Sequence, residues 1–349
     1  MTTLQHLLRT ALPVIQAPMA GVQGHALAAA VSNAGALGSL PCAMLGVDAM
    51  RKELATIKAQ TTRPFNVNFF CHAPPVPSAE REAAWRAALA PYYAEYGIDP
   101  ATISAGPGRL PFSHEAADVL AEFRPAVVSF HFGLPSADLL ARVRGWGAKV
   151  LSSATTVDEA RWLQAHGADA VIAQGLEAGG HRGMFLSDDL DTQLGTFALL
   201  PQIVRAVDIP VIAAGGIADA NGVAAALALG AAGVQVGTAY LLCPEATTST
   251  LHRAALKDPA HVTALTNLFT GRPARGIVNR VMRELGPLSR AVPAFPLATS
   301  ALAPLRARAE ARGSGDFSPL WAGQNRSGCK GIGAAELTRE LACMRPAMR

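Results

Sequence analysis

The chain has 349 residues, of which 50% are hydrophobic and 16% are charged. A chain this long and this apolar can bury a large core, so its composition argues against disorder. Its formal net charge of +4 is small, and it carries no recognisable nucleic-acid motif. We therefore expect a globular protein that binds no nucleic acid, with at most a basic surface around arginines of the last third such as Arg272 and Arg275.

The sequence contains five widely separated cysteines: Cys42, Cys71, Cys243, Cys329 and Cys343. Their odd number and the lack of a Cys-x-x-Cys pair argue against a disulfide framework and a zinc site, and fit a reducing compartment. The first nine residues are too polar for a signal peptide, and glycines interrupt the most apolar stretch, residues 222–240. We expect a cytoplasmic protein with no bound metal and no membrane partner.

Short apolar runs alternate with stretches of helical composition. The runs are almost entirely apolar, which is typical of strands buried on both faces of a parallel sheet. Strand and helix in alternation indicate an α/β protein, and eight repeats favour a closed (β/α)8 TIM barrel, which reaches this length as one unit with insertions. The predicted strands cover residues 14–17, 36–39, 65–69, 127–130, 149–152, 170–173, 210–213 and 233–236.

The helices between these strands carry recognisable ends. Residues 157–165 and 219–229 have helical composition, and Asp158 suits the first turn of its helix. Asp219 stands where an N-cap belongs, and Gly230 stands where a glycine commonly ends a helix.

Two segments do not fit the repeat. Residues 71–122 and 241–322 each follow the end of a strand, so both are expected at the catalytic mouth of the barrel. We predict that they form a small, mostly helical lid or substrate domain over a barrel of residues 1–70 and 123–240, followed by a C-terminal helix within residues 323–349. The alternative is that both segments only decorate the barrel.

The most informative motif follows the sixth strand, where residues 174–183 read Gln-Gly-Leu-Glu-Ala-Gly-Gly-His-Arg-Gly. Glycines such as Gly179 and Gly180 permit positive φ and close approach of the backbone to a ligand. Histidine is the side chain best suited to proton transfer near neutral pH. We therefore predict that His181 touches the substrate.

Two glycine-containing turns end the last two strands. Gly215 and Gly216 follow the seventh strand, and Gly237 and Thr238 follow the eighth. Loops at these positions of a barrel commonly hold a phosphate through backbone N–H groups. Together the two turns predict a cofactor that carries a phosphate.

Three further residues point toward the same mouth. Met19, after Pro18 at the end of the first strand, can contact a flat ring. On the third strand Asn66 and Asn68 face the same side, where a buried amide needs a partner. His131, at the end of the fourth strand, is a candidate for a substrate contact or for a packed core histidine.

Together these motifs resemble the nitronate monooxygenase family over roughly residues 10–325, including a late Leu-Trp-Ala-Gly-Gln at residues 320–324. The resemblance implies FMN as cofactor and the oxidation of alkyl nitronates by dioxygen to a carbonyl compound and nitrite. It implies His181 as the catalytic residue, either abstracting a proton from the neutral nitroalkane or binding the nitronate anion. The positions that match the family's FMN contacts are Asn68, Gln174, Gly179, Gly216, Gln235, Val236, Gly237 and Thr238.

The chain departs from the family in a segment where tyrosines and a lysine are expected. Phe295, Thr299 and Ala303 stand there, which leaves the physiological substrate open. The alternatives are an FMN-dependent NAD(P)H:quinone reductase, a flavin enoyl-thioester reductase and a non-catalytic FMN-binding barrel. A Rossmann-type Gly-x-Gly-x-x-Gly is absent, and the choice between monomer and homodimer also stays open.

Overall fold

The computed structural model describes residues 3–103 and 108–343, and its centre is a sheet of eight parallel strands. Every predicted strand is present, with ends within two residues of the predicted ones. The strands are β1 (Val14–Gln16), β2 (Gly38–Pro41), β3 (Phe65–Phe70), β4 (Val127–His131), β5 (Lys149–Ala154), β6 (Ala170–Gln174), β8 (Val211–Ala214) and β9 (Gly233–Val236).

The sheet closes into a barrel. Its strands follow the order β1-β9-β8-β6-β5-β4-β3-β2, so β1 and β2 are its two ends. These ends meet where Ile15 bridges Leu37, and the Leu37 N–H donates to the Val14 carbonyl at 3.0 Å. The predicted (β/α)8 barrel is therefore confirmed, and the carboxyl ends of its strands converge at one mouth.

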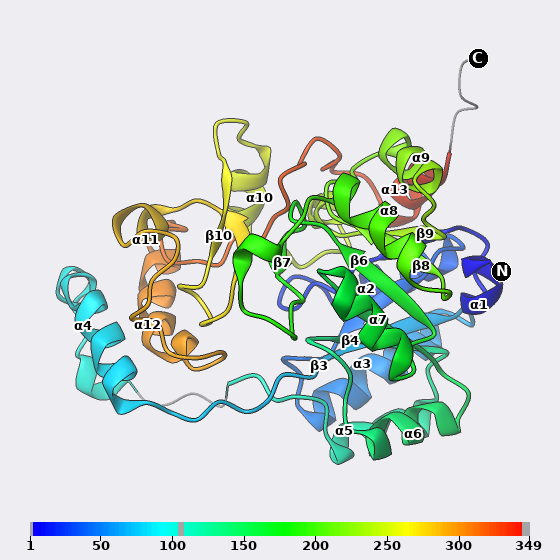
Figure 1. Ribbon diagram of the computed structural model, residues 1–349. Helices are drawn as coiled ribbons and strands as arrows, with labels where there is room; N and C mark the ends of the chain where they lie inside the picture. Colours follow the sequence, from blue (N-terminus) through cyan, green and yellow to red (C-terminus); the bar gives the residue numbers. More distant parts are fainter. Residues whose placement is uncertain (1–2, 104–107, 344–349) are drawn as a thin grey trace.

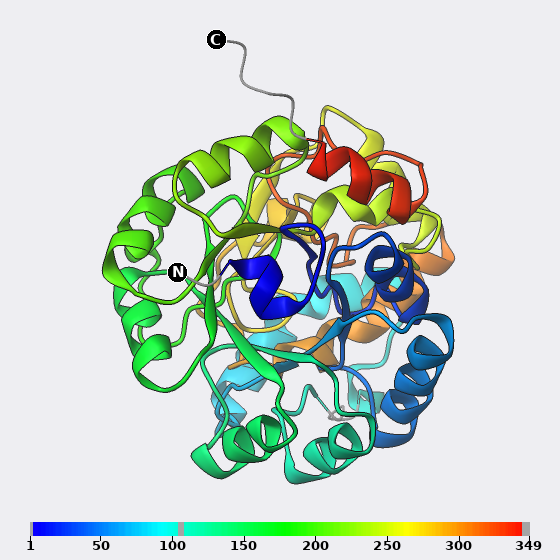
Figure 2. The same cartoon turned by 90° about the vertical axis from the view of Figure 1, so that its right-hand side faces the viewer.

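The opposite mouth is covered by the short helix α1 (Leu4–Leu8), which lies at the centre of the ring in Figure 2. Leu4 and Leu8 are each only 1% exposed and pack with Ile15, Leu151 and Ile212 inside the barrel. This apolar floor leaves the carboxyl-terminal mouth as the open end.

An outer ring of helices covers the strands (Figure 2). Two hydrophobic clusters lie between the two layers. Asp219 caps α9 (Ala220–Ala228) as predicted, accepting from the Gly222 N–H at 2.8 Å, and Gly230 has a φ of 98°. The ring consists of α2 (His25–Asn33), α3 (Val47–Gln60), α5 (His114–Phe123), α6 (Ala137–Gly145), α7 (Val157–Ala165), α8 (Thr196–Ala206), α9 (Ala220–Ala228) and α13 (Ala334–Ala342).

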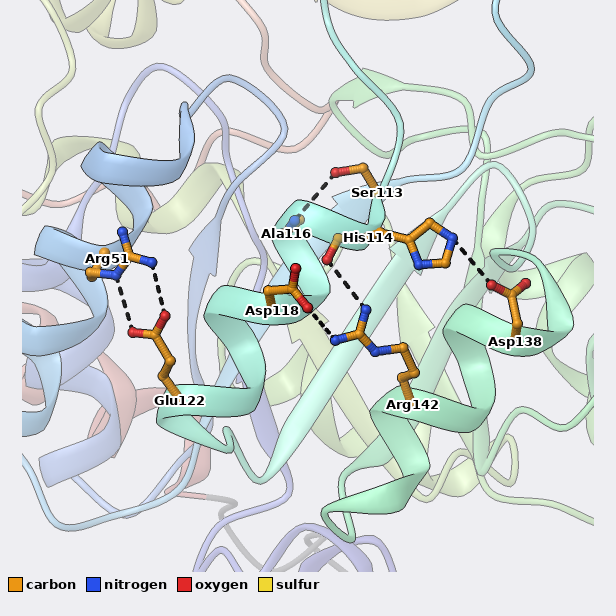
Figure 3. A network of polar contacts seen from close by, with 8 residues as sticks. All are labelled: Arg51, Ser113, His114, Ala116, Asp118, Glu122, Asp138 and Arg142. Atoms are coloured by element: carbon orange, nitrogen blue, oxygen red, sulfur yellow. Dashed lines mark hydrogen bonds and ion pairs between the residues drawn. The ribbon is translucent and has the colours of Figure 1, made fainter.

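Exposed ion pairs connect α5 to its neighbours in this ring (Figure 3). Arg51 of α3 donates to Glu122 at 2.8 Å, and Arg142 of α6 pairs with Asp118. Because α5 packs as a barrel helix, the segment predicted as a lid, residues 71–122, includes part of the ring. The division into barrel, lid and C-terminal helix otherwise stays a prediction.

Segments far apart in the sequence form a second layer beside the open mouth. Helix α4 (Ala79–Tyr96) lies against α12 (Ala298–Ala311), as the cyan and orange helices of Figure 1 show. The Trp85 indole donates to the Ala298 carbonyl at 3.3 Å, and the Tyr93 hydroxyl donates to the Ala301 carbonyl at 2.7 Å. Residues of α4 and α12 form one hydrophobic cluster, and helix α11 (Arg280–Glu284) contributes Val281 and Met282 to it.

A three-stranded antiparallel sheet, which no pattern in the sequence predicted, connects this layer to the barrel. It has the order β10 (Thr263–Thr266), β11 (Ala274–Ile277) and β7 (Gly180–His181). Because β7 is only two residues long, it has no periodic pattern from which it could be predicted.

The remaining elements are α10 (Thr250–Lys257), η1 (Pro100–Thr102), η2 (Leu190–Thr192) and η3 (Thr238–Leu242). Among the helices of the described segments, none has the length and hydropathy needed to cross a bilayer.

Candidate active site

A cavity opens at the carboxyl-terminal mouth of the barrel, with an empty volume of about 1330 Å³ counted out to its opening. That volume is ample for a ligand of cofactor size. All predicted site residues except one line it: Met19, Asn68, His131, Gln174, Gly179, Gly180, His181, Gly215, Gly216, Gln235, Gly237 and Thr238.

The exception is Val236. Its side chain is 1% exposed and packs in the cluster between the strands and the outer helices, near Val223 and Ala239. Successive side chains of a strand point to opposite faces, so Gln235 reaches the cavity and Val236 does not. The structure therefore gives no support to a side-chain contact between Val236 and a ligand.

The ends of β8 and β9 present backbone to the cavity. Gly215 and Gly216 have φ values of 113° and 74°, which disfavour any residue with a side chain. A Cβ on Gly215 would also lie 2.9 Å from the Thr196 Oγ1. These glycines leave the backbone uncovered in the arrangement that binds phosphate oxygens.

The segment at residues 320–325 lies over these turns. The Gly323 N–H donates to the Thr238 Oγ1 at 2.9 Å, and the Asn325 amide donates to the Gly216 carbonyl at 2.9 Å. A Cβ on Gly179 would lie 2.5 Å from the Gly323 nitrogen. The glycine at position 179 is therefore needed for close packing against this segment.

Two buried polar atoms in the cavity wall have no hydrogen-bond partner among the described residues: the Gln235 Oε1 and the His252 Nε2. No motif surrounds His252 in the sequence, yet this residue is only 3% exposed. Burial lowers its pKa to about 4, so the ring is neutral at pH 7. Buried polar atoms require partners, and FMN carries N–H and hydroxyl donors. The cavity wall thus fits FMN.

His181 is held by its backbone as well as by its ring. It pairs with Ala274 across β7 and β11. Its carbonyl accepts from the Gln174 Nε2 at 2.9 Å and from the His131 Nε2 at 3.2 Å. Its own Nε2 lies 2.9 Å from the Thr270 Oγ1. The ring therefore has a fixed place in the cavity wall.

The side chains of Gln174 and His131 form hydrogen bonds with other protein groups. The Gln174 Oε1 also accepts from the Gly183 N–H at 2.7 Å, and the His131 Nδ1 lies 3.1 Å from the Ser153 Oγ. Burial lowers the pKa of His131 to about 4. Both side chains line the cavity, but this geometry suits them to positioning His181 rather than to direct contact with FMN or substrate.

Two half-buried arginines, Arg109 and Arg272, act on His181. Arg109 lines the cavity and donates to the Thr299 Oγ1 at 3.4 Å, and the Arg272 guanidinium lies 4.1 Å from the centre of the Phe132 ring. Neither has a carboxylate partner among the described residues. Burial, followed by the charge of Arg109, holds the pKa of His181 well below its usual range.

The expectation of a basic surface was wrong for Arg272 and Arg275. Arg275 is 5% exposed, and its Nε donates to the Leu176 carbonyl at 2.9 Å. Arg272 is half-buried and donates to the Met184 carbonyl at 2.7 Å. No motif surrounds Arg109 or Thr270, so only the fold could bring them to the site.

Aromatic rings form the apolar wall around His181. Its ring centre lies 5.3 Å from Phe295, 5.9 Å from Phe70 and 5.6 Å from Trp321. Of the three departures noted in the sequence, Phe295 is in this wall, Thr299 contacts Arg109, and Ala303 is exposed on α12.

Glu177 is the one acidic residue among those that line the cavity. Its carboxylate accepts from the Thr196 N–H at 2.8 Å and from the Thr196 Oγ1 at 2.9 Å. These donors, at the N-terminus of α8, compensate its charge. The uncompensated charge at the cavity is therefore positive. No group of three or more His, Cys, Asp or Glu side chains in the described ranges has the arrangement of a metal site.

Known proteins resemble this chain over nearly its whole length. Residues 1–343 match the family model described as nitronate monooxygenase. The chain belongs to the nitronate monooxygenase family. It is 44% identical over 339 residues to the nitronate monooxygenase of Pseudomonas aeruginosa, covering 94% of this chain and 95% of that protein. It is 35% identical to a probable nitronate monooxygenase of Bacillus subtilis, covering 94% of each chain.

Two solved structures are similar to the structure of this member of the nitronate monooxygenase family. The nitroalkane oxidase of Streptomyces ansochromogenes superposes with a TM-score of 0.88 at 41% identity, covering 98% of this chain and 97% of that one. FabK from Thermotoga maritima superposes with a TM-score of 0.71 at 27% identity, covering 98% and 95%. The family is flavin-dependent, which agrees with the glycine turns and unpartnered polar atoms of the cavity.

Proposed function

We propose that this protein is an enzyme that uses FMN and dioxygen to oxidise alkyl nitronates to a carbonyl compound and nitrite. Atoms and charge balance when two nitronates and one dioxygen give two carbonyl compounds and two nitrite ions. The observation that carries the proposal is the uncompensated positive charge around a neutral His181, beside a phosphate-type glycine cradle. An anionic substrate and a phosphate-bearing cofactor match these two parts of one cavity.

FMN would be held by the turns at Gly215, Gly216, Gly237 and Thr238 and by the Asn68 and Gln235 amides. When bound it supplies the oxidation–reduction chemistry. The protein positions the substrate against the apolar wall, excludes water and moves protons.

His181 is the proposed proton acceptor. Because its pKa lies well below the usual range, the ring is neutral at pH 7 and can take the α-proton of a neutral nitroalkane. Arg109 lines the same cavity and would stabilise the negative charge that develops on the nitro group. With a preformed nitronate no proton transfer is needed, and both residues hold the anion.

Anaerobic absorbance spectra test the proposal. We expect the yellow protein to bleach when a nitronate is added and to change little with NADH. Mass analysis of the heat-released cofactor should give FMN. Rapid bleaching by NADH alone would favour a quinone reductase or an enoyl-thioester reductase, and bleaching by neither would favour a non-catalytic flavin-binding barrel.

Nitronate and dioxygen are the partners in this proposal. A homodimer and a cytoplasmic location stay predictions. The five cysteines, all unpaired, are compatible with a reducing compartment.

A further inference from the structure

Thr270 contacts His181 from outside the barrel. It lies between β10 and β11, is 1% exposed and belongs to no motif. Its Oγ1 is 2.9 Å from the His181 Nε2 and 3.5 Å from the Arg272 carbonyl oxygen. The hydroxyl thus stands between a ring nitrogen and a backbone acceptor.

The hydrogen atoms at this contact have two arrangements. A hydroxyl donates one hydrogen and accepts through its lone pairs. If it donates to the Arg272 carbonyl, it accepts from the His181 Nε2–H, and the lone pair is on Nδ1. If it donates to Nε2, the hydrogen is on Nδ1. Among the described residues the His181 ring forms its hydrogen bond through Nε2, so Nδ1 is the nitrogen left for a ligand.

Electrostatics favour the first arrangement. Arg109 is the charged group that acts most strongly on His181, and it lines the cavity. Because Nε2 is occupied by Thr270, Nδ1 is the nitrogen that remains for the cavity, and the positive charge of Arg109 favours a lone pair over a hydrogen there. The Arg272 carbonyl accepts no other hydrogen bond from the described residues, so it is available to the Thr270 hydroxyl.

We propose that Thr270 is a positioning residue that keeps a hydrogen on the His181 Nε2 and so makes Nδ1 the atom that removes the substrate proton. The α-proton of the nitroalkane passes to Nδ1, and the electron pair of the broken C–H bond forms the C=N bond of the nitronate. The imidazolium that results still donates its Nε2–H to the Thr270 Oγ1. The reaction in this scheme rests on the proposed function, but the hydrogen position does not.

Nitrogen NMR of the FMN-loaded, ¹⁵N-histidine-labelled protein tests the hydrogen position directly. The His181 signals are identified by their loss in His181→Asn. We expect a protonated Nε2 and an unprotonated Nδ1 in the wild type and in Thr270→Ser. In Thr270→Val, which cannot accept from Nε2–H, the fraction of His181 protonated on Nε2 should fall and the fraction protonated on Nδ1 should rise, and an unchanged ratio would contradict the role of Thr270. A wild-type His181 protonated on Nδ1 would overturn the proposal.

Kinetics supply the second readout. Thr270→Val should lower kcat/KM for a neutral nitroalkane about tenfold to a hundredfold, which corresponds to one buried hydrogen bond to a charged group. Turnover of the preformed nitronate should change less than about threefold, because no proton is transferred. Thr270→Ser, which keeps the hydroxyl, should oxidise the nitroalkane at a rate near that of the wild type. Thr338→Val is the matched control, because it removes a buried hydroxyl on α13, away from His181.

Equal losses of Thr270→Val on both substrates, or no loss on either, would contradict a role in proton transfer. If the valine variant does not fold, the wild-type and serine spectra still decide the hydrogen position. A protein with Nε2 protonated that oxidises neither substrate would refute the proposed function and leave the assignment of the hydrogen intact.

Discussion

The two sides of the cavity are built in different ways. Beside β8 and β9 the wall is backbone, exposed by Gly215, Gly216 and Gly237 at strand ends of the barrel. Around His181 the wall is made of side chains, several of which, such as Arg109, come from segments outside the barrel. A backbone wall offers the same N–H groups whatever the neighbouring side chains are, whereas a side-chain wall changes with each substitution. The first suits a constant cofactor and the second a variable substrate.

The sharpest way to break this contrast is to place a side chain in the backbone wall. Gly216→Asp adds a carboxylate where a phosphate is expected, and a Cβ there already lies 3.5 Å from the Glu177 Cβ. We expect FMN affinity to fall at least about a hundredfold, because like charges at a few ångströms repel and the φ of 74° disfavours aspartate. Flavin content and the melting temperature are the measurements.

Gly313→Asp is the matched control, since Gly313 has a φ of 75° with nothing within 4 Å of an added Cβ. It carries the same backbone strain without the phosphate. Full flavin content in Gly216→Asp would mean that the phosphate lies elsewhere.

The next prediction concerns the centre of the side-chain wall. His181→Asn should slow oxidation of a neutral nitroalkane about a hundredfold or more, the usual range for a general base, and affect the preformed nitronate much less. FMN content should stay near normal, because Gln174 and His131 hold the backbone carbonyl of residue 181 and not its ring. Paired kinetics with both substrates, using the exposed His166→Asn as control, provide the comparison. Equal losses on both would assign His181 to binding alone.

The third prediction is that the positive charge of Arg109 affects both the binding of the nitronate and the pKa of His181. Arg109→Met should raise KM for a nitronate about tenfold, in line with the loss of a hydrogen bond to a charged group. Because Arg109 lowers the pKa of His181, its removal should raise that pKa. The proton-accepting form exists only above the pKa, so the acid limb of the kcat/KM profile on nitroalkane should move to higher pH.

Arg308→Met, on the exposed face of α12, should change neither quantity. An unchanged KM in Arg109→Met would show that this cation does not contact the anion and that the side-chain wall selects substrates by shape.

The smallest predicted effect is on the free energy of unfolding, and it comes from the buried His72, which does not line the cavity. Burial lowers the pKa of His72 to about 4, against 6.5 for a free histidine. Between these two pH values, His72 binds a proton in the unfolded chain but not in the folded chain. The free energy of unfolding is therefore unaffected by His72 above about pH 6.5 and decreases as the pH drops toward 4, by about 2 kcal/mol between pH 7 and pH 5 for one such group.

Urea unfolding of the wild type and of His72→Gln at both pH values measures this contribution. His72 does not line the cavity, so the pH dependence of FMN binding cancels between the two proteins. An identical pH dependence in both would show that His72 titrates normally in the fold.

Sequence patterns alone were sufficient for the barrel and for the backbone wall. Buried parallel strands require continuous apolar runs, and turns at strand ends require glycine where φ is positive, so both leave a local mark at residues such as Gly215 and Gly216. The motif around His181 was visible for the same reason. The pleat of β9 turns the Val236 side chain away from the cavity, so a contact of this position with FMN, which stays a prediction, would have to use its backbone.

The side-chain wall was decided by tertiary structure. Thr270, Arg109 and His252 have no local pattern, because their function depends on neighbours that are distant in sequence: Thr270 meets His181 across 89 residues. The β7–β11 pairing joins two segments that are each too short to show a period. Burial, which lowers the pKa of His181 and of His252, is a property of the packed chain. Periodicity and glycine positions record backbone geometry, whereas the chemistry of this wall depends on which side chains the fold encloses together.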